Sequence, residues 1–245
     1  MPLPKLSIPD YECVLPRGQK VTYRPFLVRE EKLLYLAMET QDNKEMIKAV
    51  KDIIKACTNI KNVNELATFD IEYLFLKIRG KSVGEVSEFK ITCPDDEETK
   101  VDIQVNLDEV KVQIPKEHTN KLQVSDEITI TMKYPSLDVF VKNNLVDNPG
   151  VDDLFKLAAT CTDSIAEGED VYEGKDHTTK ELVEFYESMD SVQFSKVQKF
   201  FETMPKLTHT IEVFNPKTEV TSPIVLEGLA SFSRSPSARL LDEYV

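Results

Sequence analysis

The chain has 245 residues, of which 41% are hydrophobic and 30% are charged, which is typical of a globular protein and excludes a disordered or fibrous one. Its formal net charge is −13, unevenly spread: residues 1–81 hold 14 Lys and Arg against 11 Asp and Glu, and residues 82–245 hold 16 against 32. We therefore expect no binding to nucleic acid or anionic membranes, and no apolar run reaches the roughly 18 residues of a membrane-spanning helix.

The first 27 residues are rich in proline and predict an extended arm. Val21 and Tyr23 alternate with polar residues before Pro25, a pattern of an edge strand or a docking arm. The N-terminus lacks the apolar stretch of a signal peptide, so we expect an unexported protein with reduced thiols. The four cysteines are Cys13, Cys57, Cys93 and Cys161.

Two helices are predicted next, over residues 29–38 and after residue 43. The second has a clean apolar stripe, formed by Met46, Ile47, Val50, Ile53, Ile54 and Cys57. Its opposite face carries a row of lysines, formed by Lys44, Lys48, Lys51 and Lys55. Two interpretations of this row remain open, a solvated helix face and a contact with an acidic partner.

A third helix is predicted from a cap at Thr68 to a stop at Gly80. It is apolar nearly all round, so it is expected to be buried by neighbours or by another chain. Gly80-Lys81-Ser82 matches the last three residues of a nucleotide-binding P-loop. However, Phe75 stands where that loop needs its first glycine, so we reject nucleotide binding.

From Val83 to Lys133 the hydrophobic period is close to two, which predicts a small antiparallel β region with one buried face. A hairpin is expected around residues 95–98. Cys93 and Asp96 have the spacing of a zinc knuckle whose second cysteine is missing. Four zinc ligands cannot be assembled around them, so we expect no metal.

Helical patterns return over residues 136–144 and 150–165, followed by an acidic linker at 166–179. Thr178 and Glu181 then form a capping box for a helix, and a further helix ends before Pro205. A final β hairpin turns around Asn215, and the tail at 233–245 is expected to be loose unless a partner orders it.

These patterns predict an α+β fold, with helical N-terminal and C-terminal segments around a small antiparallel β region and with a final β hairpin. Along the chain we divide it into an N-terminal arm with helices (1–82), an antiparallel β region (83–135), and a helical region with the C-terminal hairpin (136–245). The three segments could also form one continuous domain.

No catalytic constellation is recognisable. The three histidines, His118, His177 and His209, are far apart in the sequence, and no nucleophile motif or metal-binding His cluster occurs. We expect neither enzymatic activity nor a cofactor.

Four segments resemble the baseplate proteins of T-even-type myoviruses, a family with a baseplate hub subunit and a hub-assembly catalyst. They are residues 69–85 (FDIEYLFLKIRGKSVGE), 180–209, 226–233 and the N-terminal stretch 11–40. Members of this family often have cysteine pairs in their β hairpins. Here one hairpin has Cys93 and Asp96 and the other has Asn215, so the resemblance implies no metal site.

The resemblance implies a non-enzymatic structural or assembly protein of the baseplate central hub. Its partners would be other hub and tail proteins, not nucleic acid, membrane or a small-molecule substrate. It would be found in the tail baseplate of the virion or in the host cytoplasm during assembly. We predict two contact regions, the arm and the third helix, with these residues: Tyr23, Arg24, Phe26, Tyr73, Phe75, Lys77, Arg79 and Lys81.

Two alternatives remain open. One is a dissociable assembly chaperone that is absent from the virion, and the other is a tail-associated enzyme such as a peptidoglycan hydrolase.

Overall fold

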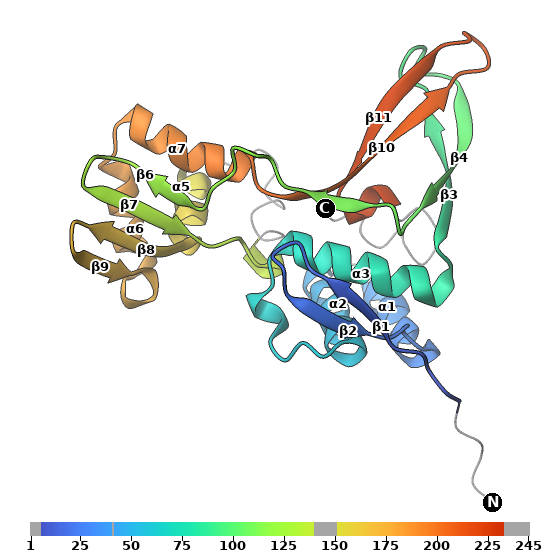
Figure 1. Cartoon of the computed structure of the whole chain (residues 1–245), viewed down its shortest axis with the longest axis horizontal. Coiled ribbons are helices and arrows are strands. Elements are labelled where there is room, and N and C mark those ends of the chain that lie inside the picture. The colour runs from blue at the N-terminus through green and yellow to red at the C-terminus, as the bar shows by residue number, and fades with distance from the viewer. Residues whose placement is uncertain (1–5, 41, 140–150, 233–245) are drawn as a thin grey trace, which may run out of the picture. The chain divides into compact units, whose positions relative to one another are not determined.

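The computed structural model describes residues 6–40, 42–139 and 151–232, and it confirms the predicted α+β fold (Figure 1). The chain forms two compact units. The first consists of Met1–Gln113 together with Lys206–Val245, and the second is Ile114–Pro205. The division expected from the sequence, at 82 and 135, follows the type of element along the chain and stays a prediction.

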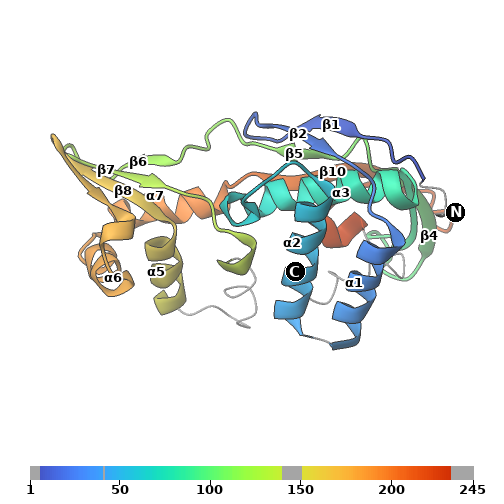
Figure 2. The same cartoon turned by 90° about the horizontal axis from the view of Figure 1, so that it is seen from below.

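The first unit begins with a β hairpin and two helices. Strands β1 (Tyr11–Val14) and β2 (Lys20–Tyr23) pair antiparallel, which confirms a strand in the arm. Helices α1 (Val28–Thr40) and α2 (Asn43–Cys57) pack against each other, and the predicted stripe of α2 lies in the core. In Figure 2 the hairpin lies on one side of α3, and α1 and α2 extend from the other side.

Helix α3 (Thr68–Val83) follows a short 3-10 helix, Val63–Glu65, and its predicted ends were wrong. The residue before its first turn is Ala67, whose side chain makes no capping hydrogen bond. The helix continues through Gly80 and ends at Gly84, whose φ of 122° is accessible to glycine and strained for other residues. Gly80-Lys81-Ser82 is therefore helical.

The sequence predicted one antiparallel β region after α3, and this prediction was wrong, because the strands that follow belong to separate sheets. Among the described strands, β3 (Val86–Thr92) and β4 (Lys100–Asn106) pair only with each other. Strand β5 (Lys111–Gln113) instead joins β10 (Lys206–Phe214) and β11 (Thr221–Glu227). The predicted final hairpin, β10–β11, is confirmed, and a 3-10 helix, Leu229–Phe232, follows it. The reason for the difference is that β5 pairs with a strand far along the chain.

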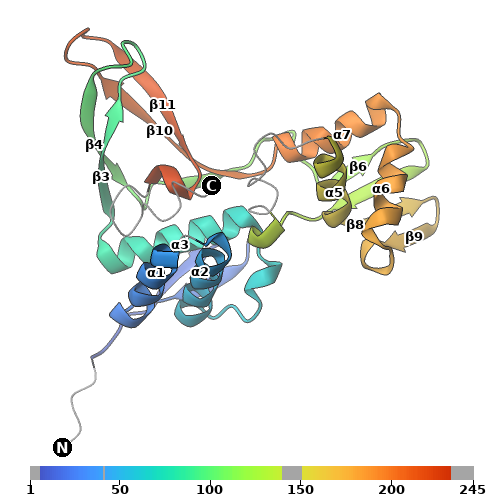
Figure 3. The same cartoon turned by 180° about the vertical axis from the view of Figure 1, so that it is seen from behind.

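The tips of the β3–β4 and β10–β11 hairpins lie side by side (Figure 3). The buried amide of Asn215 donates to both carboxylate oxygens of Asp95 at 3.0 Å, and Thr218 also donates to Asp95. Lys217 pairs with Glu98 at 2.9 Å and with Asp96 at 3.3 Å. A polar network therefore joins the two turns.

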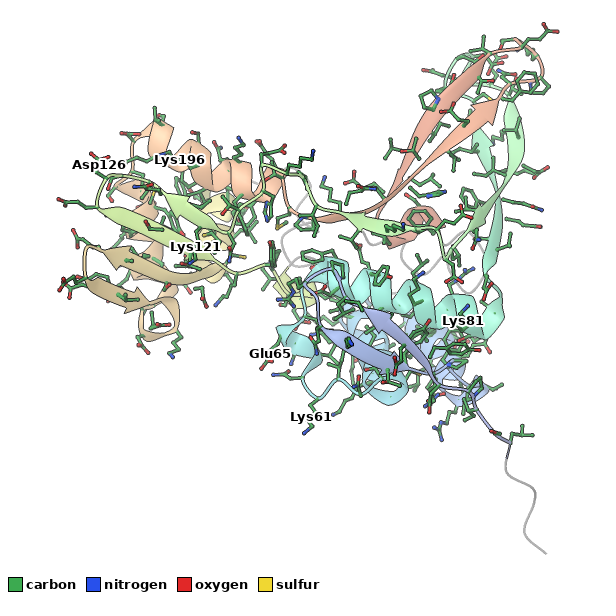
Figure 4. All side chains as sticks on the ribbon, viewed as in Figure 1. Lys61, Glu65, Lys81, Lys121, Asp126 and Lys196 are labelled. Atoms are coloured by element: carbon green, nitrogen blue, oxygen red, sulfur yellow. The ribbon has the colours of Figure 1, made fainter. Side chains whose placement is uncertain are left out.

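The second unit has a four-stranded antiparallel sheet in the order β6 (Lys121–Gln123), β7 (Ile128–Met132), β8 (Thr162–Glu167) and β9 (Asp170–Glu173). Helices α5 (Val151–Thr160), α6 (Thr179–Glu187) and α7 (Ser191–Glu202) share its core. Lys196 of α7, labelled in Figure 4, donates to the backbone carbonyl of Gln123 at 2.7 Å.

Two predictions in this unit were wrong. The helix expected over 150–165 ends at Thr160 and is followed by β8, and the expected acidic linker contains the end of β8, β9 and a 3-10 helix, Gly174–Asp176. The capping box of Thr178 and Glu181 is confirmed. Of the helix expected at 136–144, residues 137–139 are helical and Ser136 is not. Residues 140–144, like the tail at 233–245, lie outside the described residues.

Candidate interaction surface around helix α3

Helix α3 is mostly apolar, yet it buries three charged side chains. Asp70 is fully buried, and Lys77 and Arg79 are 9% and 6% exposed. A buried charge costs several kcal/mol unless it is paired and hydrogen-bonded. Each of these three charges therefore needs a partner, and Asp70 and Lys77 have one within the first unit.

Asp70, at the start of α3, holds the turn of the β1–β2 hairpin. Arg17 Nε donates to Asp70 Oδ2 at 2.7 Å, and Arg17 Nη2 donates to the carbonyl of Glu65 at 3.3 Å. Asp70 Oδ1 has no hydrogen-bond partner in the described part of the chain. Burial raises the pKa of Asp70, and the charge of Arg17 only partly offsets this effect.

Lys77 and Lys81, one turn apart near the end of α3, share one carboxylate. Lys77 Nζ lies 3.1 Å from Asp108 Oδ1, and Lys81 Nζ lies 3.1 Å from Asp108 Oδ2. Lys81 also donates to Glu85, and its hydrogen bonds to the carboxylates of Glu85 and Asp108 raise its pKa. Figure 4 shows Lys81 at the C-terminal end of α3, where a positive charge also complements the helix dipole.

Three tyrosines gather around these two lysines. The Tyr11 and Tyr23 ring centroids are 5.7 Å apart, Lys81 Nζ lies 5.5 Å from the Tyr11 ring, and Lys77 Nζ lies 5.4 Å from the Tyr73 ring. Tyr23 is buried, and burial raises its pKa to about 12; Tyr11 and Tyr73 are half-buried. We call these five residues the tyrosine–lysine cluster. Half-buried tyrosines of this kind are enriched at protein–protein contacts.

Arg79 differs from the other charges of α3. Its Nε and Nη1 atoms are buried and have no hydrogen-bond partner among the described residues. Burial lowers its pKa, and no charged partner among the described residues opposes this effect. A buried guanidinium that lacks an acceptor can be satisfied only by an acceptor from outside the described residues.

The structure brings four of the eight predicted contact residues together in the tyrosine–lysine cluster, namely Tyr23, Tyr73, Lys77 and Lys81. The other four lie elsewhere in the first unit. Arg24 donates to Glu30 and to the carbonyl of Ala56, each at 3.0 Å, and Phe26 and Phe75 are buried. Contact of the eight residues with a partner stays a prediction.

Sequence reasoning missed Tyr11 and Asp108. Tyr11 lies in an alternating stretch, Tyr11 to Val14, which is a weak strand signal that could have paired it with Tyr23. Asp108 had no signal, because its contact with Lys77 joins positions 31 residues apart in sequence.

The described residues contain no group of three or more His, Cys, Asp or Glu side chains placed to hold a metal ion. The four cysteines are free thiols, and all except Cys13 are buried. No helix in the described ranges is long and apolar enough to cross a membrane.

Comparison with known families gives one match. The family described as T4 bacteriophage base plate protein matches residues 8–233. Comparisons with curated proteins and with solved structures found no match.

Proposed function

The chain belongs to the family of T4 bacteriophage base plate proteins, and on this premise we propose that it is a non-enzymatic structural or assembly protein of the baseplate central hub. In this proposal it acts through contacts with other hub and tail proteins while the baseplate of a contractile-tailed phage is built. Membership of the family implies a location in the tail baseplate of the virion. The position in the central hub, the non-enzymatic role and the direct contacts with hub and tail proteins are what we propose.

The tyrosine–lysine cluster is the observation that carries this proposal. Tyr11 and Tyr73 are half-buried, and the lysines beside them are held in place by Asp108. Such pre-ordered aromatic and cationic side chains lose little entropy when they are covered by a partner. The surface therefore suits a protein that works by association.

Arg79 supports the same proposal from inside the helix. Two nitrogens of its guanidinium have no hydrogen-bond partner among the described residues, and a carboxylate or carbonyl acceptor supplied during assembly would satisfy them. Its burial means that the acceptor reaches it only if the side chains that cover it move.

The proposal is tested by co-purification from infected cells, with tagged wild-type chain, Tyr73→Ala, Tyr73→Phe and a matched control, Tyr35→Ala. Tyr35 is an exposed tyrosine of α1 outside the cluster. We expect hub proteins to co-purify with the wild type, with Tyr73→Phe and with Tyr35→Ala. Tyr73→Ala should lose most of them while its circular dichroism spectrum remains that of the folded chain.

Recovery of the same partners with Tyr73→Ala, or partners that are all non-baseplate proteins, would contradict the proposal. The protein composition of purified phage particles separates its two forms. A structural subunit remains in the particle, and an assembly chaperone does not.

A further inference from the structure

The second unit contains a cavity between its sheet and helix α6. The cavity has a volume of about 250 Å³, and its apolar lining is formed by Ile128, Ile165, Tyr172, Leu182 and Phe185. Small-molecule pockets usually measure roughly 300–1,000 Å³. This cavity is therefore slightly smaller than that range, and it is large enough to hold one long side chain.

Three titratable side chains complete the lining, namely Glu167, His177 and Glu181. Glu181 accepts hydrogen bonds from Thr178 through Oε2; these bonds, and to a smaller extent the charge of the neighbouring His177, lower its pKa. Within the described ranges, neither Glu167 nor Glu181 forms an ion pair with a lysine or arginine. The cavity thus combines apolar walls, which include the aromatic side chains of Tyr172 and Phe185, with two carboxylates that have no lysine or arginine partner among the described residues. This combination suits the aliphatic stem and the charged head of an arginine or lysine.

Strand β9 forms one side of this site and is the edge of its sheet. Only β8 pairs with it among the described strands, and all four residues of β9 are exposed. Val171 is 59% exposed and Tyr172, which lines the cavity, is 43% exposed. An edge strand with exposed apolar side chains is a template for pairing with an extended segment.

The charge around β9 indicates which segment can pair there. Residues 161–190 contain ten Asp or Glu residues and two Lys residues. A second copy of β9 in antiparallel pairing would set Asp170 against Glu173, and like charges directly opposite each other are destabilising. A basic segment would be attracted instead.

We propose that this edge binds an extended, basic segment of another protein, which pairs with β9 as an added strand and places one arginine or lysine side chain in the cavity. Strand pairing supplies the backbone hydrogen bonds, and the cavity supplies the specificity. The proposal goes beyond the hub assignment and does not rest on it.

The test uses the full chain labelled with ¹⁵N and a short acetylated and amidated peptide, Thr-Val-Arg-Val-Thr. We expect the peptide to shift the amide resonances of residues 165–173 and 181–185. Replacing its arginine by citrulline, which keeps the shape and removes the charge, should weaken binding about tenfold or more. Methylating its backbone nitrogens on the pairing edge should have a similar effect, because it removes the strand hydrogen bonds.

On the protein side, the double variant Glu167→Gln with Glu181→Gln should weaken binding of the arginine peptide about tenfold. Glutamine at position 181 can retain the capping box, so the helix is expected to remain folded. Glu184→Gln, which changes a carboxylate of α6 outside the cavity lining, should leave binding unchanged. Equal binding of the citrulline or methylated peptide, shifts confined to other elements, or no binding at millimolar peptide would overturn the proposal.

Discussion

Arg79 is a side chain whose charge is expected to lower the stability of the isolated chain and to strengthen its binding to partners. Its guanidinium is buried with two donor atoms unpaired, so it is expected to destabilise the isolated chain. We predict that Arg79→Met, which keeps the length and removes the charge, raises the free energy of unfolding by roughly 1–3 kcal/mol. The measurement is urea unfolding, followed by the co-purification described above, in which the variant should recover fewer hub proteins.

Arg79→Lys is the matched control, because it keeps a buried charge and should bring no gain in stability. A loss of stability in Arg79→Met would show that the guanidinium is satisfied in the isolated chain. Unchanged recovery of hub proteins would remove Arg79 from the contact residues.

Glu30, in the first turn of α1, gives the stability a dependence on pH. Burial raises its pKa, but hydrogen bonds from Arg24, Arg29 and the backbone of Leu27 outweigh this and lower it to about 2, from an ordinary value of 4.5. Because the folded pKa is the lower one, the stabilisation is complete above pH 4.5 and is lost as the pH falls towards 2.

We therefore predict that Glu30→Gln lowers the free energy of unfolding at about pH 7, and that its difference from the wild type shrinks at about pH 3. Glu31→Gln, at the neighbouring carboxylate of the same turn, is the control and should show a much smaller effect. A difference for Glu30→Gln that stays constant with pH would mean that packing, and not charge, explains the loss.

Local capping could be predicted at the residue scale, and distant pairing could not. The capping box of Thr178 and Glu181 depends on residues three apart, so the sequence alone identifies it. Asp108 lies 31 residues from Lys77, and their ion pair arises only because the chain folds back on α3. The sequence therefore pointed to four of the five residues of the tyrosine–lysine cluster, but neither to Tyr11 nor to the carboxylate of Asp108 that holds the two lysines.

At the scale of elements, two glycines near the end of α3 have opposite effects on the helix: Gly80 lies inside it and Gly84 ends it. Gly80 is in the helix interior, where an added Cβ would meet only Leu107 Cβ at 3.9 Å. Gly84 ends the helix with a φ of 122°. We predict that Gly80→Ala raises the free energy of unfolding by about 0.5–1 kcal/mol and that Gly84→Ala lowers it by about 1–2 kcal/mol.

Thermal or urea unfolding of the two variants measures this directly, and each variant is the control for the other. If Gly80→Ala were the destabilising change, the helix would end at Gly80, as the sequence pattern had suggested.

Periodic elements were predictable, and short acidic strands were not. The apolar stripe of α2 runs from Met46 to Cys57, about three turns of a 15-residue helix, so its period is clear in the sequence. Strands β8 and β9 have six and four residues and carry several carboxylates, a composition that resembles a solvated linker. Their pairing depends on β7, which precedes them by about thirty residues, so the cavity beside β9 was missed entirely.

At the scale of the whole molecule, the first unit is built from two segments that are far apart in the sequence. The segment from Lys206 returns to the first unit, where β10 pairs with β5. Sequence patterns describe neighbours along the chain, so they predicted the β10–β11 hairpin but gave no sign of the third strand. The second unit is thus an insertion between two paired strands.

The register of that pairing leads to the last prediction. Gln113, the last residue of the first segment, and Lys206, the first of the returning segment, are direct cross-strand partners. An Asn-Gly turn can join two antiparallel strands at such a pair. We predict that the first unit folds when residues 114–205 are replaced by Asn-Gly.

The excised residues 114–205 should also fold alone, because they bury their own core around Ile130, Val197 and Phe200. Both products should unfold cooperatively in urea. A fragment of the same length, residues 130–221, is the control: it lacks Leu122 and Val124 of that core and carries β10 without β5, so it should not unfold cooperatively. If either predicted product failed to unfold cooperatively, the two units would depend on each other for stability. The second unit would then be inserted in the chain order without being an independently folding domain.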